Sequence, residues 1–134
     1  MTISDSEKKS LIEYRIKQAF ETAEVAELLF HTKLYPTALN RIYYSVFYYM
    51  LALAIQLNYK TSKHAQLLGW FNRNFIATGK IEREYGKIVR DCYEFRLSAD
   101  YDSFVNFAVE DVAVLLKEMK SFLYRIELYI KENE

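Results

Sequence analysis

ALNRIYYSVFYYMLALAIQL, residues 38–57, is the stretch of sequence that decides the fold. Between Ile42 and Leu57 it carries no charge, and the whole stretch contains neither Gly nor Pro. A helix that is apolar nearly all round is one that its neighbours bury on several sides. A bilayer-spanning helix needs about 20 apolar residues, whereas this run is shorter and places tyrosine hydroxyls where the bilayer centre would lie. We therefore expect a central core helix that the other helices surround.

The composition indicates one folded domain without a general attraction to nucleic acid. The chain has 134 residues, 51% of them hydrophobic and 16% aromatic, which is enough to bury a core in one domain over residues 1–134. Lys plus Arg and Asp plus Glu both number 18, so the formal net charge is +0 and an RNA contact would need a local basic patch. The polar start MTISDSEKKS is no signal peptide, so we expect a cytoplasmic protein without membrane contact.

Apolar residues recur at helical spacing along most of the chain and predict an all-α fold of five helices. The expected ranges are residues 5–31, 36–58, 63–78, 81–99, and 102 or 103 nearly to the end. Asp5 or Ser6 would cap the first helix and Ser62 the third, and Gly79 would end the third in a left-handed conformation. The long stripes of the first and last helices suggest that these two pack together or across a dimer.

Known catalytic and metal-binding motifs are absent from the sequence. It has no Gly-rich phosphate loop, HExxH, EF-hand or GxSxG pattern. The two histidines, His31 and His64, are far apart, and neither has the Glu three residues earlier that di-iron bundles use. The single Cys92 lies on an apolar stripe, where we expect a core residue, and it excludes an intrachain disulfide. We expect neither a metal ion nor a cofactor.

A polar cluster stands at the end of the predicted fourth helix. Arg96 continues the apolar stripe of that helix, so it should face the core or a cleft rather than open solvent. Asp100 lies four residues later, and the pair either clasps the helix end or leaves the guanidinium to hold a phosphate in a bidentate manner. Tyr101 and Asp102 follow directly in a predicted turn.

A second group of candidates lies on the predicted second and third helices. Lys63 and His64 begin the third helix, where free backbone N–H groups favour an anion and an imidazole suits acid–base chemistry; otherwise His64 is a packing residue. Arg41 shares a helical face with Tyr44, so it either buries its stem among tyrosines or contacts an anion. If Arg41, Lys63 and His64 share a surface with Arg73 and Arg96, they form a basic patch that favours RNA binding.

Several motifs occur together in a fixed order along the chain. They are Ala38-x-x-Arg41-Ile-Tyr43-Tyr44-Ser45-Val46-Phe47, Ser62-Lys63-His64, Phe71, Phe75-x-x-Thr78-Gly79 and Arg96-x-x-Ala99-Asp100-Tyr101-Asp102. In this order they resemble the small single-domain branch of the HEPN-domain family, over about residues 8–130. The resemblance implies a five-helix up-and-down bundle that commonly forms a homodimer. It also implies a frequent partner, a minimal nucleotidyltransferase encoded next door, the two acting as toxin and antitoxin.

The resemblance also implies a chemistry, from which this sequence departs at one position. Many HEPN toxins are metal-independent ribonucleases whose motif is an Arg, four to six further residues and a His. The Arg holds the scissile phosphate and the His transfers protons, and two such sites are paired at a dimer interface. Arg96 matches the arginine, but the positions for the histidine hold Tyr101, Asp102 and Ser103. His64 from another helix, or Tyr101 as an acid, would have to substitute. In some of these systems the nucleotidyltransferase adds AMP to a Tyr near the place of Tyr101.

The sequence thus leaves three functions open. The first is a toxin-like HEPN protein that binds RNA and cleaves it without a metal. The second is a non-catalytic helical partner that binds the nucleotidyltransferase, or a nucleotide, through the same groove. The third is a plain interaction module whose polar cluster only stabilises the fold. The predicted catalytic residues are Arg96, His64 and Tyr101, and the predicted binding residues are Arg41, Lys63, Asp100, Asp102 and Tyr44.

Overall fold

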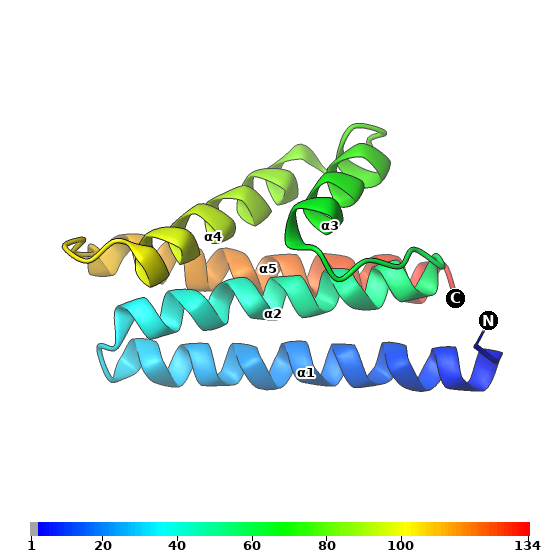
Figure 1. The fold of residues 1–134 in the computed structure, drawn as a ribbon, viewed down its shortest axis with the longest axis horizontal. Helices are drawn as coiled ribbons and strands as arrows, with labels where there is room; N and C mark the ends of the chain where they lie inside the picture. Colours follow the sequence, from blue (N-terminus) through cyan, green and yellow to red (C-terminus); the bar gives the residue numbers. More distant parts are fainter. Residues whose placement is uncertain (1–2) are drawn as a thin grey trace.

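The computed structural model describes residues 3–134, and these form an all-helical bundle. The elements are α1 (Asp5–His31), α2 (Tyr35–Gln56), α3 (His64–Phe71), the π-helical turn η1 (Asn72–Ile76), α4 (Arg83–Tyr101) and α5 (Val109–Glu132). In Figure 1, α1, α2 and α5 run alongside one another, while α4 crosses above them and α3 rises at an angle. The prediction of an all-α, five-helix bundle is confirmed.

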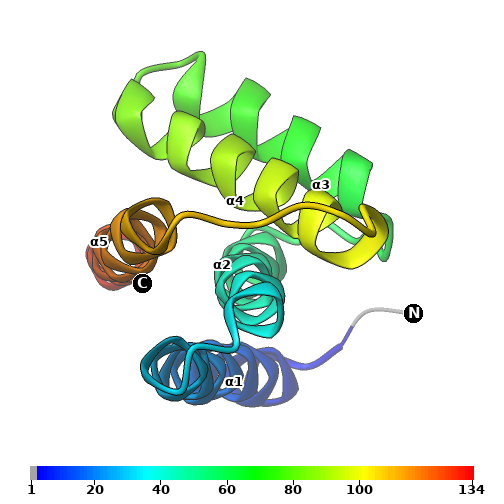
Figure 2. The ribbon, with the colours of Figure 1, turned by 90° about the vertical axis from the view of Figure 1, so that its left-hand side faces the viewer.

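Helix α2 occupies the centre of the bundle, as the sequence predicts. It contacts α1, α3, α4 and α5, and the end-on view in Figure 2 shows α1 on one side of it and α3 with α4 on the other. Tyr43, Tyr49 and Met50 are fully buried. The Ser45 hydroxyl donates to the Ala19 carbonyl of α1 over 2.8 Å. No helix of residues 3–134 has the length and apolarity to cross a membrane.

Helices α1 and α5 pack against α2 and against each other. The predicted stripes supply this contact, since Ala19, Ala23 and Ala26 of α1 are buried, as are Met119, Phe122 and Ile126 of α5. The small side chains of the three alanines let α1 approach α2 closely. A polar link adds to the packing, because the Lys120 ammonium lies 2.9 Å from the Glu27 carboxylate.

Helix ends differ from the predicted ones by a few residues. Ser4, rather than Asp5 or Ser6, caps α1 by accepting a hydrogen bond from the Glu7 amide. At the start of α3 the N-cap residue is Lys63 rather than Ser62, and among residues 3–134 no side chain caps this helix. The Thr61 hydroxyl accepts a hydrogen bond from the Lys63 amide over 3.1 Å. Ser4 thus satisfies one of the free N–H groups of α1, for which the prediction chose a neighbouring side chain.

The predicted third helix is divided between α3 and η1. The Ala77 amide donates to the Asn72 carbonyl, five residues back, over 2.8 Å, and such π-turns are frequent at functional sites. The wider turn brings Phe75 into the core, with its ring 5.6 Å from the Phe71 ring. Gly79 follows with a φ of 76°, which confirms the predicted left-handed conformation.

The start of the last helix was predicted incorrectly. Helix α5 begins at Val109, not at Asp102 or Ser103, and residues 102–108 form a connection after α4. Asp102 is extended, with φ −98° and ψ 114°, so it ends α4 instead of beginning a helix. Phe104, whose spacing predicts the first residue of the apolar stripe of the last helix, lies outside α5 and is 98% exposed. The acidic first turn of α5, Glu110 and Asp111, suits the positive end of the helix dipole.

Candidate functional site

Three helices bring the predicted polar residues together. The N-terminal half of α2 supplies Tyr43 and Tyr44, the first residue of α3 supplies His64, and the last turns of α4 supply Arg96 and Asp100. Arg96 and His64 both contact the two tyrosines. The structure therefore joins two residues whose proximity could not be read from the sequence.

Arg96 is held on several sides at once. Its Nε donates to Asp100 Oδ2 over 2.8 Å, and its Nη2 donates to the Tyr44 hydroxyl over 3.1 Å. The guanidinium carbon also lies 5.4 Å from the centroid of the Tyr43 ring and 5.9 Å from that of Tyr101. The side chain is 14% exposed. Partial burial lowers the pKa of Arg96, but Tyr44 and Asp100 raise it further, so the guanidinium stays charged.

His64 lies in an aromatic pocket beside that guanidinium. Its Nδ1 is 2.7 Å from the Tyr43 hydroxyl, and its ring stacks on Phe47 with the centroids 4.2 Å apart. Burial, and secondly the charge of Arg96, lower the pKa of His64 below its usual 6.5. Burial also raises the pKa of Tyr43, so its hydroxyl stays protonated. The imidazole is thus neutral near pH 7 and has Nε2 available for proton transfer.

The Tyr43 hydroxyl is compatible with either neutral form of the His64 ring. It can accept a hydrogen bond from a protonated Nδ1, which leaves Nε2 free to take a proton. It can equally donate to an unprotonated Nδ1, in which case Nε2 carries the proton. Tyr43 therefore orients the imidazole without restricting it to one role.

Asn40 joins α2 to the polar end of α4. Its amide nitrogen donates to both carboxylate oxygens of Asp100, over 3.0 and 3.3 Å, and its amide oxygen accepts from Arg41 Nε and Nη2 over 3.0 and 2.8 Å. The Arg41 guanidinium lies 5.1 Å from the Tyr44 ring centroid. A chain of bonds thus connects Arg41, Asn40, Asp100 and Arg96, and it places two guanidinium groups beside one phenol ring.

The other predicted residues lie at the edge of this cluster. Tyr101 is 70% exposed and touches the cluster through Arg96. Lys63 and Asp102 are exposed, and within residues 3–134 their side chains form no hydrogen bond or ion pair. Arg73 lies on η1, with a guanidinium nitrogen 3.1 Å from where a Cβ on Gly69 would be. Of the residues predicted to form a basic patch, Arg41, Arg96 and His64 contact the same Tyr44 ring.

Three residues of the site were not predicted as site residues: Asn40, Tyr43 and Phe47, although the last two stand in the motif that carries the family resemblance. All three lie on the α2 face that bears Tyr44. Their spacing of three and four residues was visible, and a polar Asn beside an apolar run needs a partner when it is covered. That signal could have pointed to Asn40, but not to Asp100 as its partner.

The sequence matches to known proteins include all the residues of this site. The model of the HEPN domain matches residues 12–129. The chain belongs to the HEPN domain family. An UPF0332 protein of Thermotoga maritima is 37% identical over 127 residues, which is 95% of this chain and 96% of the relative.

Two relatives from Methanocaldococcus jannaschii carry names that refer to an activity. "Putative toxin MJ0142" is 30% identical over 130 residues, or 97% of this chain and 88% of the relative. "Putative toxin MJ0605" is 34% identical over 121 residues, or 90% of each. All three aligned lengths are long enough to include most of the HEPN helices.

This HEPN site combines a fixed positive charge with a neutral imidazole in a half-buried pocket. Such a pair can bind a phosphate and transfer a proton. Within residues 3–134, no three His, Cys, Asp or Glu side chains gather closely enough to hold a metal ion. The chemistry that Arg96 and His64 themselves can supply is phosphate binding and acid–base catalysis.

Proposed function

We propose that this HEPN protein is a toxin-like protein that binds RNA at Arg96 and His64 and cleaves it without a metal ion. The observation that carries the proposal is their common contact with Tyr43 and Tyr44. The family motif expects its histidine after four to six further residues, at positions that hold Tyr101, Asp102 and Ser103 here. Here the first residue of α3 supplies an imidazole to the same pocket, in a neutral state that suits proton transfer. The two relatives named as toxins support the toxin assignment.

The side chains suggest a division of work in the cleavage step. Asp100 and Tyr44 engage Nε and Nη2 of Arg96, so Nη1 remains to bind a phosphate oxygen and stabilise the charge that develops on it. His64 Nε2 takes the proton from the ribose 2′-hydroxyl, whose oxygen forms a bond to phosphorus as the bond to the 5′-oxygen breaks. The hydroxyl of the exposed Tyr101 gives its proton to that leaving oxygen. Water then reprotonates Tyr101, and the hydroxide that this leaves takes the proton from His64 Nε2. The products are a 2′,3′-cyclic phosphate and a 5′-hydroxyl.

The test is incubation of purified protein with a mixed RNA pool in EDTA, followed by analysis of the fragment ends. Wild type should produce cyclic phosphates, and Arg96→Ala and His64→Ala should each lose that activity, by roughly 10²-fold or more for a general base. Arg15→Ala and His31→Ala on α1 are matched controls and should cleave normally. No cleavage by wild type, or equal cleavage by both pairs of variants, would refute the catalytic assignment.

A second candidate function is a non-catalytic partner of a minimal nucleotidyltransferase. It is favoured by the residues at the motif positions for His, which are Tyr101, Asp102 and Ser103, and by the exposure of the Tyr101 hydroxyl beside Arg96. Here the expected result is co-purification with the nucleotidyltransferase encoded next door. AMP transfer from ATP to wild type, but not to Tyr101→Phe, would identify the accepting residue by mass spectrometry. Absence of both would count against this function.

A further inference from the structure

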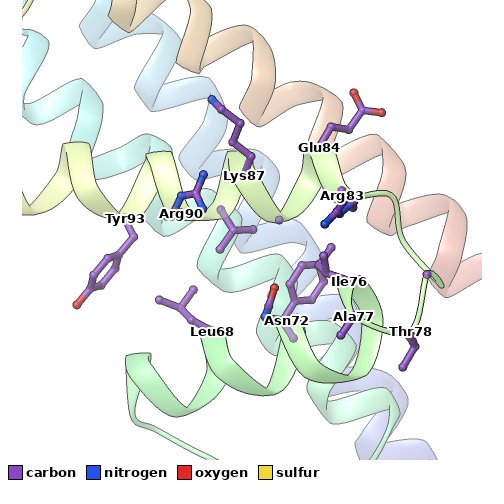
Figure 3. A pocket seen from close by; sticks show the side chains of 14 residues that line it. Leu68, Asn72, Ile76, Ala77, Thr78, Arg83, Glu84, Lys87, Arg90 and Tyr93 are labelled. Atoms are coloured by element: carbon purple, nitrogen blue, oxygen red, sulfur yellow. The ribbon is translucent and has the colours of Figure 1, made fainter.

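A groove of about 1190 Å³ lies between α3–η1 and α4, next to the proposed site. Figure 3 shows Leu68, Asn72 and Ile76 on its α3–η1 side and the α4 side chains along the opposite side. Apolar residues line its depth, namely Leu68, Phe71, Ile76 and Val89. Gly86 lets α4 approach η1 there, since a Cβ at this position would lie 3.2 Å from two carbons of Ile76.

The charge along this groove is mainly positive. Arg83, Lys87 and Arg90 line it on α4, and Glu84 is its one acidic lining residue among those described. Lys87 pairs with Asp91 over 2.6 Å, and Figure 3 shows both Lys87 and Glu84 projecting from α4 on the side away from α3. Arg83 and Arg90 are exposed, and within residues 3–134 neither has a carboxylate within 4.0 Å. These two guanidinium groups are therefore available to an anion.

The groove leads into the Arg96–His64 site. Tyr93 lines its end, and the Tyr93 ring lies 5.7 Å from the ring of Tyr43, which bonds His64. On the opposite side, Leu68 stands on the next turn of α3 after His64. An extended ligand bound at the site would therefore continue past Tyr93 toward Arg90 and Arg83.

We propose that this groove holds the backbone of a single RNA strand whose scissile phosphate lies at Arg96 and His64; the proposal rests on the function proposed above. Single-stranded nucleic acid is bound by grooves that combine positive side chains for phosphates with aromatic and apolar surface for bases. Arg83 and Arg90 supply the charges, and Tyr93 with Leu68 supplies that surface. Both charges lie on one side of the groove, on α4, so they match the single phosphate backbone of one strand.

The test measures how affinity depends on RNA length. Fluorescent 2′-O-methyl oligonucleotides of about 4 and 12 nucleotides cover the site alone or the site with the groove, and they lack the 2′-hydroxyl that cleavage needs. Their binding is followed by anisotropy in EDTA, for wild type and for Arg83→Gln/Arg90→Gln. The control is Lys9→Gln/Lys17→Gln, which removes the same charge from exposed positions on α1.

We expect wild type and the control to bind the longer strand more tightly than the shorter one. The groove variant should bind the longer strand about tenfold more weakly and the shorter one unchanged. Its salt dependence should fall by about 1.4 in log affinity per log salt, because each lost phosphate contact removes about 0.7. A matching duplex should bind more weakly than the single strand.

The outcomes separate the groove from the site. If the long strand binds equally to wild type and the groove variant, or if the duplex binds best, the groove proposal is wrong while the site proposal stands. If the groove variant loses affinity but Arg96→Ala does not, the site proposal is wrong and the groove stands. If wild type binds no RNA, both are overturned.

Discussion

The hydroxyls of Tyr43 and Tyr49 offer a direct test of how this core holds the His64 imidazole. Both tyrosines are fully buried on α2, and Phe at either position removes one oxygen atom. The Tyr43 hydroxyl lies 2.7 Å from His64 Nδ1. The Tyr49 hydroxyl is buried without a hydrogen-bond partner among residues 3–134. The same chemical change should therefore have opposite effects on stability.

The magnitudes follow from the fate of each polar group. Tyr43→Phe removes a hydrogen bond with a net value of about 0.5–1.5 kcal/mol and leaves a half-buried imidazole nitrogen without its partner, so we expect a loss of about 1–2.5 kcal/mol. Tyr49→Phe removes a buried group that already lacks a partner, so we expect a gain of about 0–2 kcal/mol. In a domain of this size, 1 kcal/mol changes the melting temperature by about 4 °C.

Urea unfolding at pH 7.5, followed by circular dichroism at 222 nm, measures both free energies. The dependence of the free energy on urea should be the same in both variants, since neither changes the surface exposed on unfolding. If Tyr43→Phe costs no more than Tyr49→Phe, then the contact with His64 does not stabilise the fold and the orientation assigned to the imidazole is wrong. Loss of RNA cleavage in Tyr43→Phe, but not in Tyr49→Phe, would separately connect that contact to catalysis.

Three further predictions concern pH, an ion pair and assembly. Because folding lowers the pKa of His64, the unfolded chain binds more protons below pH 6.5, so wild-type stability should fall from pH 7.5 to 5.5 more steeply than that of His64→Gln in parallel urea titrations. Glu82→Gln breaks the 2.8 Å pair with Arg125 and should lower the free energy of unfolding by about 0.2–1 kcal/mol at pH 7. Because the bond to Arg125 lowers the Glu82 pKa below 4.5, this loss should shrink in acid, and an unchanged loss at pH 3 would contradict the pairing. Leu28 is exposed on α1; we expect a homodimer by light scattering at micromolar concentration, and a monomeric mass for wild type would rule it out.

The helices could be predicted from the sequence because their signals are local. The apolar run of α2 and the stripes of α1 and α5 reflect burial along each helix, and burial repeats with the helical period. The start of α5 was missed because Phe104 has the spacing of a core residue but is exposed. The π-turn after Phe71 was missed because one added residue per turn changes the period only briefly.

The site was predictable as a set of residues but not as an arrangement. The side chains of Arg96 and Asp100 sit four residues apart, and their contact follows from helix geometry. The meeting of Arg96 with His64 depends on how α3 and α4 cross α2, which no local pattern encodes. The family resemblance pointed to Arg96, but the positions that it implies for a histidine hold Tyr101, Asp102 and Ser103.

The two readings of Arg96, a structural clasp and a phosphate ligand, are compatible in this structure. A guanidinium has five N–H donors, and Asp100 and Tyr44 use one on Nε and one on Nη2. Asn40 in turn binds both oxygens of Asp100, so the carboxylate fixes Arg96 while being anchored to α2 itself. A charge fixed in this way loses little conformational freedom when a phosphate binds to the remaining donors. The clasp therefore makes Arg96 a better phosphate ligand than a mobile surface arginine would be.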